Sequence, residues 1–200
     1  MSTLVDKMFL WLSLIMRKSD KTRENLLAAA HEAFWQKGYS NVSVRDIAQV
    51  ANVDVALISR YFGGKLGLFE ATLDRAFVWP ELLADGADPV DVAIAKYANP
   101  ETDDVEISAT AMIVANAGDP EVGDLVRQRL WENIIAPLQD RMGGEAAATN
   151  LALFIATILG ASMTRQCLRL PAMADASPDE YARQLRHMVD AALAYVPGEA

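Results

Sequence analysis

Apolar residues recur every three or four positions along most of this chain, which is the spacing typical of amphipathic helices. Between residues 21 and 37 it predicts a helix whose apolar stripe consists of Leu26, Leu27, Ala30, Ala33 and Phe34. Gly38 follows and favours the end of this helix, because glycine readily adopts the left-handed conformation of a helix C-terminus. The first element is therefore expected to be a long helix that packs through one side.

Two short helices are predicted next, over 44–51 and 55–62. Ser43 is a favourable N-cap for the first of them, and Asp46, three residues later, gives a variant of the capping box. Asp54 is expected to cap the second. Because few residues separate the two helices, a tight turn must join them.

The later helices are longer. Gly63 and Gly64 end the third helix, and a fourth is expected to start near Lys65. Beyond Pro80, turn signals rich in Gly, Pro and Asn separate further helical segments. These segments cover 89–98, 102–117, 120–142, 145–169 and 178–195. No sustained alternation of apolar and polar residues indicates a strand, so the predicted fold class is all-α.

The residues before the first predicted helix form a separate question. Residues 4–16 are strongly apolar, but a membrane span needs about 20 such residues. A signal peptide would need a small-residue cleavage site, and Arg17 to Lys21 does not resemble one. Residues 1–20 are therefore expected to be an appendage without a membrane span. It is either a poorly ordered or loosely packed segment, which can include a short helix, or a helix that docks on a membrane surface or a partner.

The composition, 52% apolar and 22% charged over 200 residues, is that of a globular chain that can bury a sizeable core. The single cysteine, Cys167, has no partner for an internal disulfide, and His31 and His187 stand far apart in the sequence. The sequence contains no metal-ligand cluster of a usual spacing. Neither a metal nor a cofactor is expected.

Charge is distributed unevenly along the chain. The formal net charge is −9, yet residues 1–75 contain 10 basic and 8 acidic residues, whereas residues 76–200 contain 8 basic and 19 acidic residues. A slightly basic first third on a strongly acidic remainder indicates two tasks on one chain. The basic excess is too small to establish DNA binding by itself.

The two short helices have the dimensions of a helix-turn-helix unit. In such a unit a recognition helix enters the major groove of DNA while the preceding helix braces it from behind. The apolar contacts between the two would come from Ile47, Ala48, Val53, Ile58 and Phe62. From these residues alone, a plain helical corner inside a bundle is an alternative.

The stretch from Arg23 to Ala76 resembles the N-terminal DNA-binding domain of the TetR family of transcriptional regulators. The matching pieces are Ala29-Ala30, Ala33-Phe34, Gly38-Tyr39, Val42 to Ala48, Val53 to Ile58 and Arg60 to Leu68. The resemblance implies a helix-turn-helix DNA-binding domain over 21–66 and a larger helical effector-binding and dimerisation domain over 67–200. It also implies a cytoplasmic, homodimeric regulator, expected to be a repressor that a small molecule releases from double-stranded DNA.

The resemblance assigns phosphate contacts to four residues. Ser43 and Arg45 lie where the family meets the DNA backbone at the start of the second helix. Tyr61 and Lys65 match the aromatic and lysine that grip phosphates around the end of the third helix, and such hydroxyl and ammonium groups donate readily to phosphate oxygens. Simpler interpretations remain open: Ser43 as a cap alone, Tyr61 as a packed core residue and Lys65 as a solvated lysine.

The resemblance also places one face of the third helix in the major groove. The groove-facing positions are then Val55, Ala56, Ser59 and Arg60. Ser59 stands where a tyrosine is common in the family, and Val55 and Ala56 offer only apolar contact, suited to thymine methyl groups. Arg60 is the one strong candidate for reading a base, by a bidentate contact with guanine, and a phosphate contact is the alternative.

The C-terminal two thirds resemble the family in general plan. The helices over 145–169 and 178–195 look like its dimerisation pair, and a two-fold dimer implies an inverted-repeat operator. The effector pocket is expected among helices spanning roughly 65–142 and suits a hydrophobic or mildly cationic molecule. Its candidate lining residues, each of which could also be ordinary core or surface, are Trp79, Tyr97, Met112, Asn116, Trp131 and Asn133.

Two other classes of function are alternatives to a DNA-binding regulator. Paired carboxylates such as Asp103-Asp104 and Asp179-Glu180 stand at predicted helix starts, where they offset the helix dipole, and no phosphate-binding loop or nucleophile elbow is present in the sequence. An enzyme is therefore not expected. The other alternative is a scaffold or membrane-docked dimer that has lost DNA binding and attaches through its apolar N-terminus.

Overall fold

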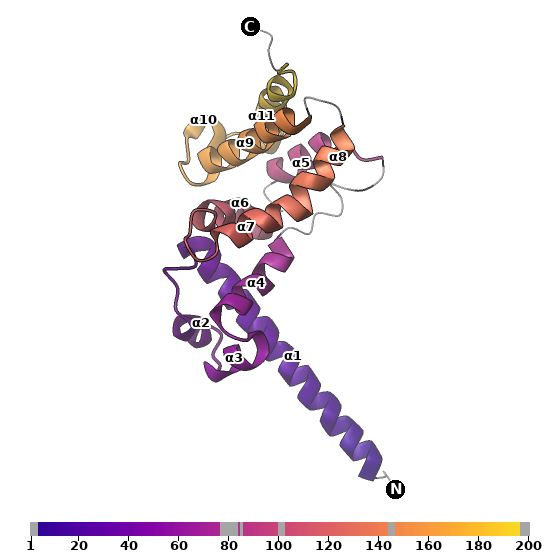
Figure 1. The fold of residues 1–200 in the computed structure, drawn as a ribbon, viewed down its shortest axis with the longest axis vertical. Coiled ribbons are helices and arrows are strands. Elements are labelled where there is room, and N and C mark those ends of the chain that lie inside the picture. Colours follow the sequence, from indigo (N-terminus) through magenta and orange to yellow (C-terminus); the bar gives the residue numbers. More distant parts are fainter. Residues whose placement is uncertain (1–3, 77–83, 85, 100–102, 144–146, 197–200) are drawn as a thin grey trace. The chain divides into compact units, whose positions relative to one another are not determined.

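The computed structural model describes residues 4–76, 84, 86–99, 103–143 and 147–196, and the regular elements in these ranges are all helices (Figure 1). The predicted all-α class is confirmed. The chain divides into two compact units, Met1–Asp74 and Arg75–Ala200.

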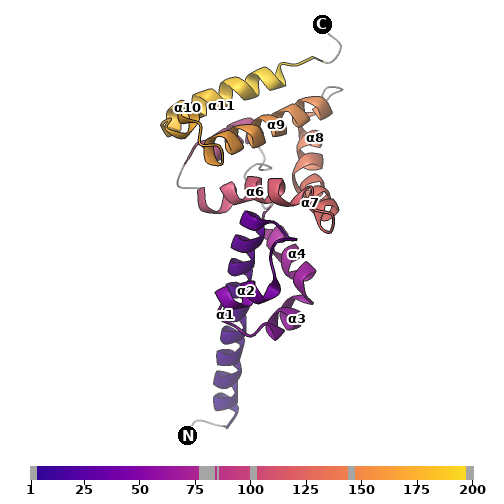
Figure 2. The same cartoon turned by 90° about the vertical axis from the view of Figure 1, so that its left-hand side faces the viewer.

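Aromatic rings hold the first unit together. Its helices are α1 (Leu4–Lys37), α2 (Val44–Val50), α3 (Ala56–Phe62) and α4 (Lys65–Ala76). Phe34 of α1 meets Phe69 of α4 edge to face, with ring centroids 5.3 Å apart, and the Tyr39 ring lies 5.2 Å from Phe69. The short helices α2 and α3 lie beside the C-terminal half of α1 (Figure 2). Ile47 and Ile58 turn inward from them and are almost completely buried.

Helix α1 begins much earlier than predicted. The apolar pattern indicated a start at residue 21, but the backbone is helical from Leu4 to Lys37 without interruption. The segment contains no glycine or proline that would break it, and its leucine, methionine and lysine residues favour helix. The expected appendage over 1–20 thus continues the first helix over its described part, and its role stays a prediction.

The division between the units also lies further along than the sequence suggested. The expected boundary was between residues 66 and 67, whereas the compact units divide between Asp74 and Arg75. The reason is the packing of α4, because Leu68, Phe69 and Leu73 are fully buried in the first unit. Most of α4 therefore belongs to the core of the first unit.

The second unit is a helical bundle. Its elements are α5 (Pro89–Ala98), α6 (Asp103–Asn116), α7 (Gly123–Leu130), the π-helical turn η2 (Trp131–Ile135), α8 (Ala136–Met142), α9 (Ala147–Gln166), α10 (Pro171–Ala174) and α11 (Pro178–Leu193). Helix α11 packs along α9 and α5, and α6 and α8 also pack on α9 (Figure 2). Tyr181, Leu185 and Val189 of α11 are fully buried and centre the core on these contacts.

The segment predicted as one helix over 120–142 is shorter and irregular. It starts at Gly123, because Asp119 closes a turn before it by accepting hydrogen bonds from the backbone N–H groups of Glu121 and Val122. Its middle widens into η2, where the Ala136 N–H donates to the Trp131 carbonyl five residues back. Pro137 follows directly, and a proline inside a helix removes one N–H donor and crowds the preceding turn. The irregular turn lies where that disruption is expected.

The last two helices also differ slightly from their predicted bounds. The helix predicted over 145–169 ends at Gln166, and Arg169 takes a left-handed conformation with φ of 48°. The short helix α10 follows where only a loop was expected. Ser177 caps α11 by accepting from the Glu180 N–H, so Asp179 and Glu180 indeed lie in a first helical turn.

Candidate nucleic-acid interface

The N-terminus of α2 is capped as predicted. The Ser43 hydroxyl oxygen accepts from the Asp46 N–H at 3.2 Å, and the same hydroxyl donates to the Asp46 carboxylate at 2.7 Å. Both side chains are exposed, as is Arg45 beside them. Because a serine has one hydroxyl hydrogen, Ser43 must release Asp46 before it donates to a phosphate. The cap is therefore its role in the free protein.

A tight turn fixes α3 against α2. Asn52 takes the left-handed conformation with φ of 53°, which asparagine tolerates better than most residues. The Val53 N–H donates back to the Ala48 carbonyl at 3.0 Å. Asp54 accepts from the Ala56 N–H at 2.8 Å, so it caps α3 as predicted, although regular helix begins at Ala56 and not at residue 55. The direction of α3 is thus set by local hydrogen bonds.

The positions predicted to face the groove lie together on the outer side of α3. Val55 is 40% exposed, and Ala56, Ser59 and Arg60 are exposed as well. Ile58, on the opposite side, is buried in the unit. The helix therefore presents these four side chains to solvent on one face, and whether they contact bases stays a prediction.

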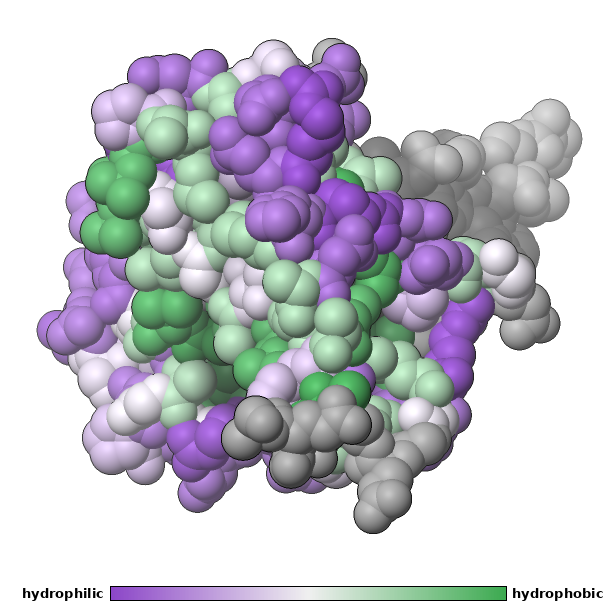
Figure 3. Space-filling view, turned by 90° about the horizontal axis from the view of Figure 1, so that it is seen from above, coloured by the Kyte–Doolittle hydropathy of each residue, from purple (hydrophilic) through white to green (hydrophobic). Residues whose placement is uncertain are grey.

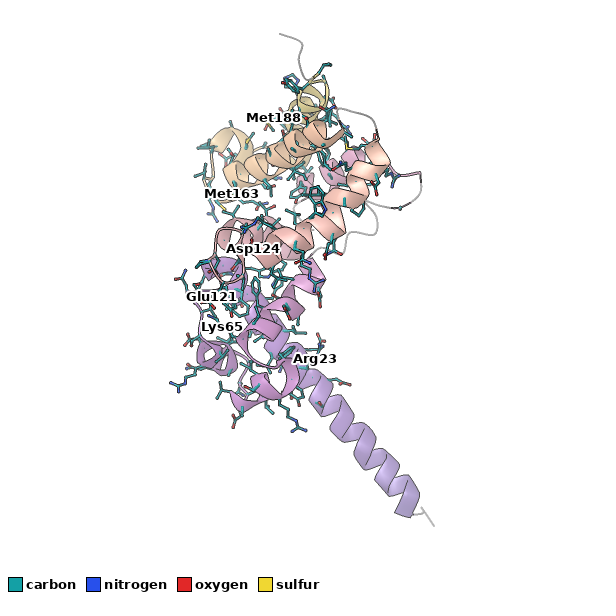
Figure 4. The ribbon with its side chains drawn as sticks, viewed as in Figure 1. Arg23, Lys65, Glu121, Asp124, Met163 and Met188 are labelled. Carbon is teal, nitrogen blue, oxygen red and sulfur yellow. The ribbon has the colours of Figure 1, made fainter. Side chains whose placement is uncertain are left out.

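The predicted phosphate-binding residues around the end of α3 are anchored by neighbours. The Tyr61 hydroxyl accepts from the Ser19 hydroxyl at 3.2 Å, and the Tyr61 side chain is half-buried. Lys65, the first residue of α4, holds its Nζ 4.1 Å from the centre of the Tyr39 ring (Figure 4). Such a cation–π contact orients an ammonium group without neutralising its charge. Lys65 is therefore held in place and still charged.

Arg23 adds a cation that the sequence interpretation did not single out. It is exposed on α1, and its guanidinium lies 5.2 Å from the centre of the Phe62 ring at the end of α3 (Figure 4). Arg60 stacks in a similar way, 5.9 Å from the Tyr61 ring. Arg23, Arg60 and Lys65 thus lie around the α3–α4 junction. Arg23 stands three positions before the first buried leucine pair, and this position gave no distinct signal in the sequence.

Gly67 is a second residue whose role the sequence did not reveal. A Cβ atom at this position would overlap the carbonyl oxygen of Phe62 and lie 3.1 Å from its carbonyl carbon. Only glycine therefore allows the first turn of α4 to pass so close to the end of α3. Gly63, with φ of 75°, ends α3 in the left-handed conformation. These two glycines together set the position of Lys65.

The second unit contains a small apolar cavity. Its volume is about 50 Å³, and it lies where α5, α6, α7, η2 and α9 meet. It is lined by Tyr97, Ala109, Ile113, Leu130, Ile134, Ile155, Ile158 and Leu159. A second, larger hollow of about 190 Å³ lies where α5, α8 and α9 meet, with Leu138, Leu151 and Phe154 in its wall.

Of the described residues predicted to bind an effector, one lines the apolar cavity. Tyr97 lines the apolar cavity, whereas Met112 and Asn116 are fully buried beside it on α6 without lining it. Trp131 is 53% exposed and Asn133 is exposed. Trp79 lies outside the described residues. Whether any of them binds an effector stays a prediction.

Two family models match the chain. The model of the bacterial regulatory proteins of the tetR family matches residues 26–72, and the model of the tetracyclin repressor-like C-terminal domain matches residues 93–193. The second match alone covers half of the chain. The protein belongs to the TetR family. The family resemblance predicted from the sequence is thereby confirmed, and the family is one of regulatory proteins, in agreement with the expectation that the chain is not an enzyme.

Two curated HTH-type transcriptional regulators each match about a quarter of this protein. The probable HTH-type transcriptional regulator YttP of Bacillus subtilis is 51% identical over 49 residues, which is 24% of this chain and 24% of YttP. The HTH-type transcriptional regulator BetI of Ectopseudomonas mendocina is 45% identical over 51 residues, 26% of each chain. Each match thus spans about a quarter of the relative's length.

Solved structures of TetR-type proteins share the fold over nearly the whole chain. NalD, the secondary repressor of the MexAB-OprM multidrug efflux pump in Pseudomonas aeruginosa, superposes with a TM-score of 0.64 at 23% identity, covering 87% of this chain and 97% of NalD. A transcriptional regulator from Rhodococcus gives a TM-score of 0.62 at 22% identity, covering 88% and 99%. At these identities the likeness concerns the fold.

Proposed function

We propose that this TetR-family protein is a homodimeric transcriptional repressor that binds an inverted-repeat operator in bacterial cytoplasm and leaves it when a small molecule binds the second unit. One observation carries the proposal most directly. The outer face of α3 is exposed, rigidly capped, and bordered by Arg23, Tyr61 and Lys65.

Different residues around α3 are suited to phosphate contacts and to base contacts. Lys65 and Arg45 are exposed or half-exposed cations at the two edges of the helix pair, suited to phosphate oxygens that carry no sequence information. On α3 itself, Arg60 has the donor geometry for guanine, while Val55 and Ala56 offer apolar surface for thymine methyl groups. Sequence preference therefore rests on a small set of contacts and on DNA shape.

The outward side of α9 supports the homodimer. From Ala147 to Thr164 this helix has no charged residue, and its solvent side carries the small, exposed Ala152, Ala156 and Gly160, which permit close helix approach. Half-exposed Met163 and, on neighbouring α11, Met188 flank this surface (Figure 4). A surface helix normally places polar residues toward water. A second copy of α9 and α11 would cover the face in a two-fold four-helix interface, as expected for 145–169 and 178–195.

Helix α9 is also long and strongly apolar. Among the described residues it is the one helix long and apolar enough to cross a membrane by those two criteria, which core helices of soluble proteins also satisfy. Its inner side, including Leu151, Phe154 and Ile158, is buried in the unit. We therefore attribute its apolar character to packing on both sides, inward on the bundle and outward on the partner copy.

Effector release requires two states with different affinity for DNA. A molecule that binds one state of the second unit more tightly shifts the population toward it, and such coupling is typically worth about 1–3 kcal/mol. The apolar cavity at α5, α6, η2 and α9 is the proposed place for that molecule. In the dimer, the effector-bound state would hold the two α3 helices at a spacing that no longer fits the operator.

Fluorescence anisotropy with labelled DNA from upstream of the protein's own gene tests the proposal. The full chain should bind this DNA more tightly than a scrambled duplex, and Arg60→Ala should weaken binding strongly. Arg183→Ala is the control, since it removes another exposed arginine, which lies on α11 outside the helix-turn-helix unit. Equal affinity for both duplexes, with Arg60→Ala indistinguishable from Arg183→Ala, would contradict the assignment of α3.

A further inference from the structure

The described wall of the apolar cavity carries no charged side chain. None of its eight described lining residues is ionised at neutral pH, and seven of them are aliphatic. Two of these, Ala109 and Ile158, are almost completely buried. A charged ligand group in such a wall would lose its hydration without gaining a counter-ion.

The nearest cation on α9 is already engaged away from the cavity. Arg165 donates from Nη1 to the Tyr97 carbonyl oxygen at 3.2 Å, and its guanidinium lies 4.1 Å from the centre of the Tyr181 ring. It therefore closes the end of α5 and packs on α11. This leaves no counter-charge in the described wall for an anionic effector.

Tyr97 supplies the one polar side chain in the described wall. Its hydroxyl lies 3.4 Å from the Thr110 hydroxyl, and both residues are buried. This distance is long for a bond between two hydroxyl groups, which are usually about 2.7–2.8 Å apart. The pair can therefore exchange part of this weak contact for a stronger bond to a ligand hydroxyl or carbonyl group.

The cavity must widen to admit an organic molecule. Its volume of about 50 Å³ is smaller than the roughly 150 Å³ of an apolar cavity that binds benzene in another protein. Two wall residues, Leu130 and Ile134, lie at the start and within the π-helical turn η2. Short π-helical segments are irregular and are often found at functional sites. We therefore expect η2 to be the part of the wall that moves.

We propose that the effector is an uncharged, mainly apolar molecule with one hydrogen-bonding group, which enters by displacement of η2 and bonds the Tyr97–Thr110 hydroxyl pair. This rests on the proposed function, of which it names the ligand class. It narrows the expectation of a hydrophobic or mildly cationic effector to the uncharged case, because the described wall holds no carboxylate.

Four ring compounds of similar size test the ligand class on the full-length protein: toluene, phenol, benzoate and benzylammonium. Binding is measured by ligand-detected NMR and by the thermal midpoint. Phenol should bind most tightly and toluene next, while benzoate and benzylammonium should bind at least about a hundredfold more weakly than phenol because of the desolvation of their charge. A charged probe that binds as tightly as phenol overturns the proposal.

Variants locate the binding site. Tyr97→Phe keeps the ring and removes the hydroxyl, so phenol should lose its advantage over toluene while toluene binds as before. Ala109→Leu fills the cavity and should weaken both uncharged probes at least tenfold. Ala115→Leu, on the exposed side of the same helix, is the matched control and should change neither. Unchanged phenol binding in a folded Ala109→Leu protein places the ligand elsewhere, for instance in the hollow beside Leu138, and overturns the assignment.

The experiments distinguish a wrong ligand class from a wrong assignment of the protein as a DNA-binding regulator. DNA binding measured without any of the ring compounds tests only the assignment of the protein as a DNA-binding regulator. If the wild-type protein binds its upstream DNA but no uncharged probe raises its thermal midpoint, the regulator stands and the ligand class is wrong. If phenol binds as expected while no duplex is preferred, the cavity is assigned correctly and the DNA-binding proposal fails.

Discussion

Replacing Gly67 by alanine should disturb the first unit through a single methyl group. The new Cβ would overlap the Phe62 carbonyl oxygen, a backbone atom that has no rotamer with which to move aside. Either α4 must shift away from the end of α3 or the last turn of α3 must distort. Overpacking of this kind typically costs about 1–3 kcal/mol.

The same shift should reach the DNA-binding surface. Gly67 lies two residues after Lys65, in the first turn of α4, and Lys65 is held over the Tyr39 ring only while that turn keeps its position. We therefore expect Gly67→Ala to lower both the thermal midpoint of the first unit and the affinity for operator DNA.

Circular dichroism melting and DNA anisotropy measure the two effects in parallel. Gly118→Ala is the control, because a Cβ there meets no atom within 4 Å and that residue lies in the loop before α7. It should change stability by less than about 0.5 kcal/mol. If Gly67→Ala melts and binds DNA like Gly118→Ala, the close passage of α4 over Phe62 is wrong.

Substitutions at four further residues probe other parts of the molecule. Lys65→Ala should weaken binding to operator and random DNA alike and reduce the slope of log K against log salt by about 1 per half-site. Arg60→Ala should instead cost about 1–3 kcal/mol of binding free energy on the operator and relax the preference at one base pair. Salt titrations on both duplexes separate the two effects, and identical behaviour of the two variants would make Arg60 a phosphate contact. Ala156→Glu places a charge on the exposed face of α9 and should convert the dimer to a monomer by light scattering, while an unchanged mass would remove α9 from the interface. Ser43→Ala should lower stability by about 1 kcal/mol through loss of the α2 cap, with Ser43→Thr close to the wild type; equal melting of all three would mean that the cap is dispensable.

Local chemistry made the helix-turn-helix unit predictable from the sequence. Ser43 and Asp54 accept from backbone N–H groups no more than three residues away, and Asp46 accepts from the Ser43 hydroxyl, so these roles can be inferred from short spacings. The three- and four-residue spacing likewise separated buried Ile58 from exposed Ser59. These features need no knowledge of distant segments.

Features that depend on how helices meet in space were missed. The close approach of Gly67 to Phe62 arises from how two helices meet, which no spacing rule contains. The cavity is lined by aliphatic residues such as Ile113 and Ile134, and an isoleucine beside a cavity has the same sequence pattern as one in a filled core. Aromatic and amide residues were predicted to line the effector pocket, and one of them, Trp131, is half-exposed.

Two of the features that differ from the prediction do have a signal in the sequence. Pro137 lies inside a helical pattern and indicates an irregular turn before it, which is where η2 occurs. The early start of α1 follows from the absence of glycine and proline between residues 4 and 37. The strong apolar run over residues 4–16 favoured an interpretation as a separate appendage, and the simple continuation of the first helix was not predicted.

Footprinting on the DNA upstream of the protein's own gene tests the central claim most directly. The account predicts a protected region with two-fold symmetry, formed by two inverted half-sites about one helical turn or somewhat more apart, one for each α3 of the dimer. Arg60→Ala should erase the protection at a protein concentration where Arg183→Ala leaves it intact. A single asymmetric half-site, or protection that no substitution on α3 alters, would contradict a dimer that reads DNA through this helix.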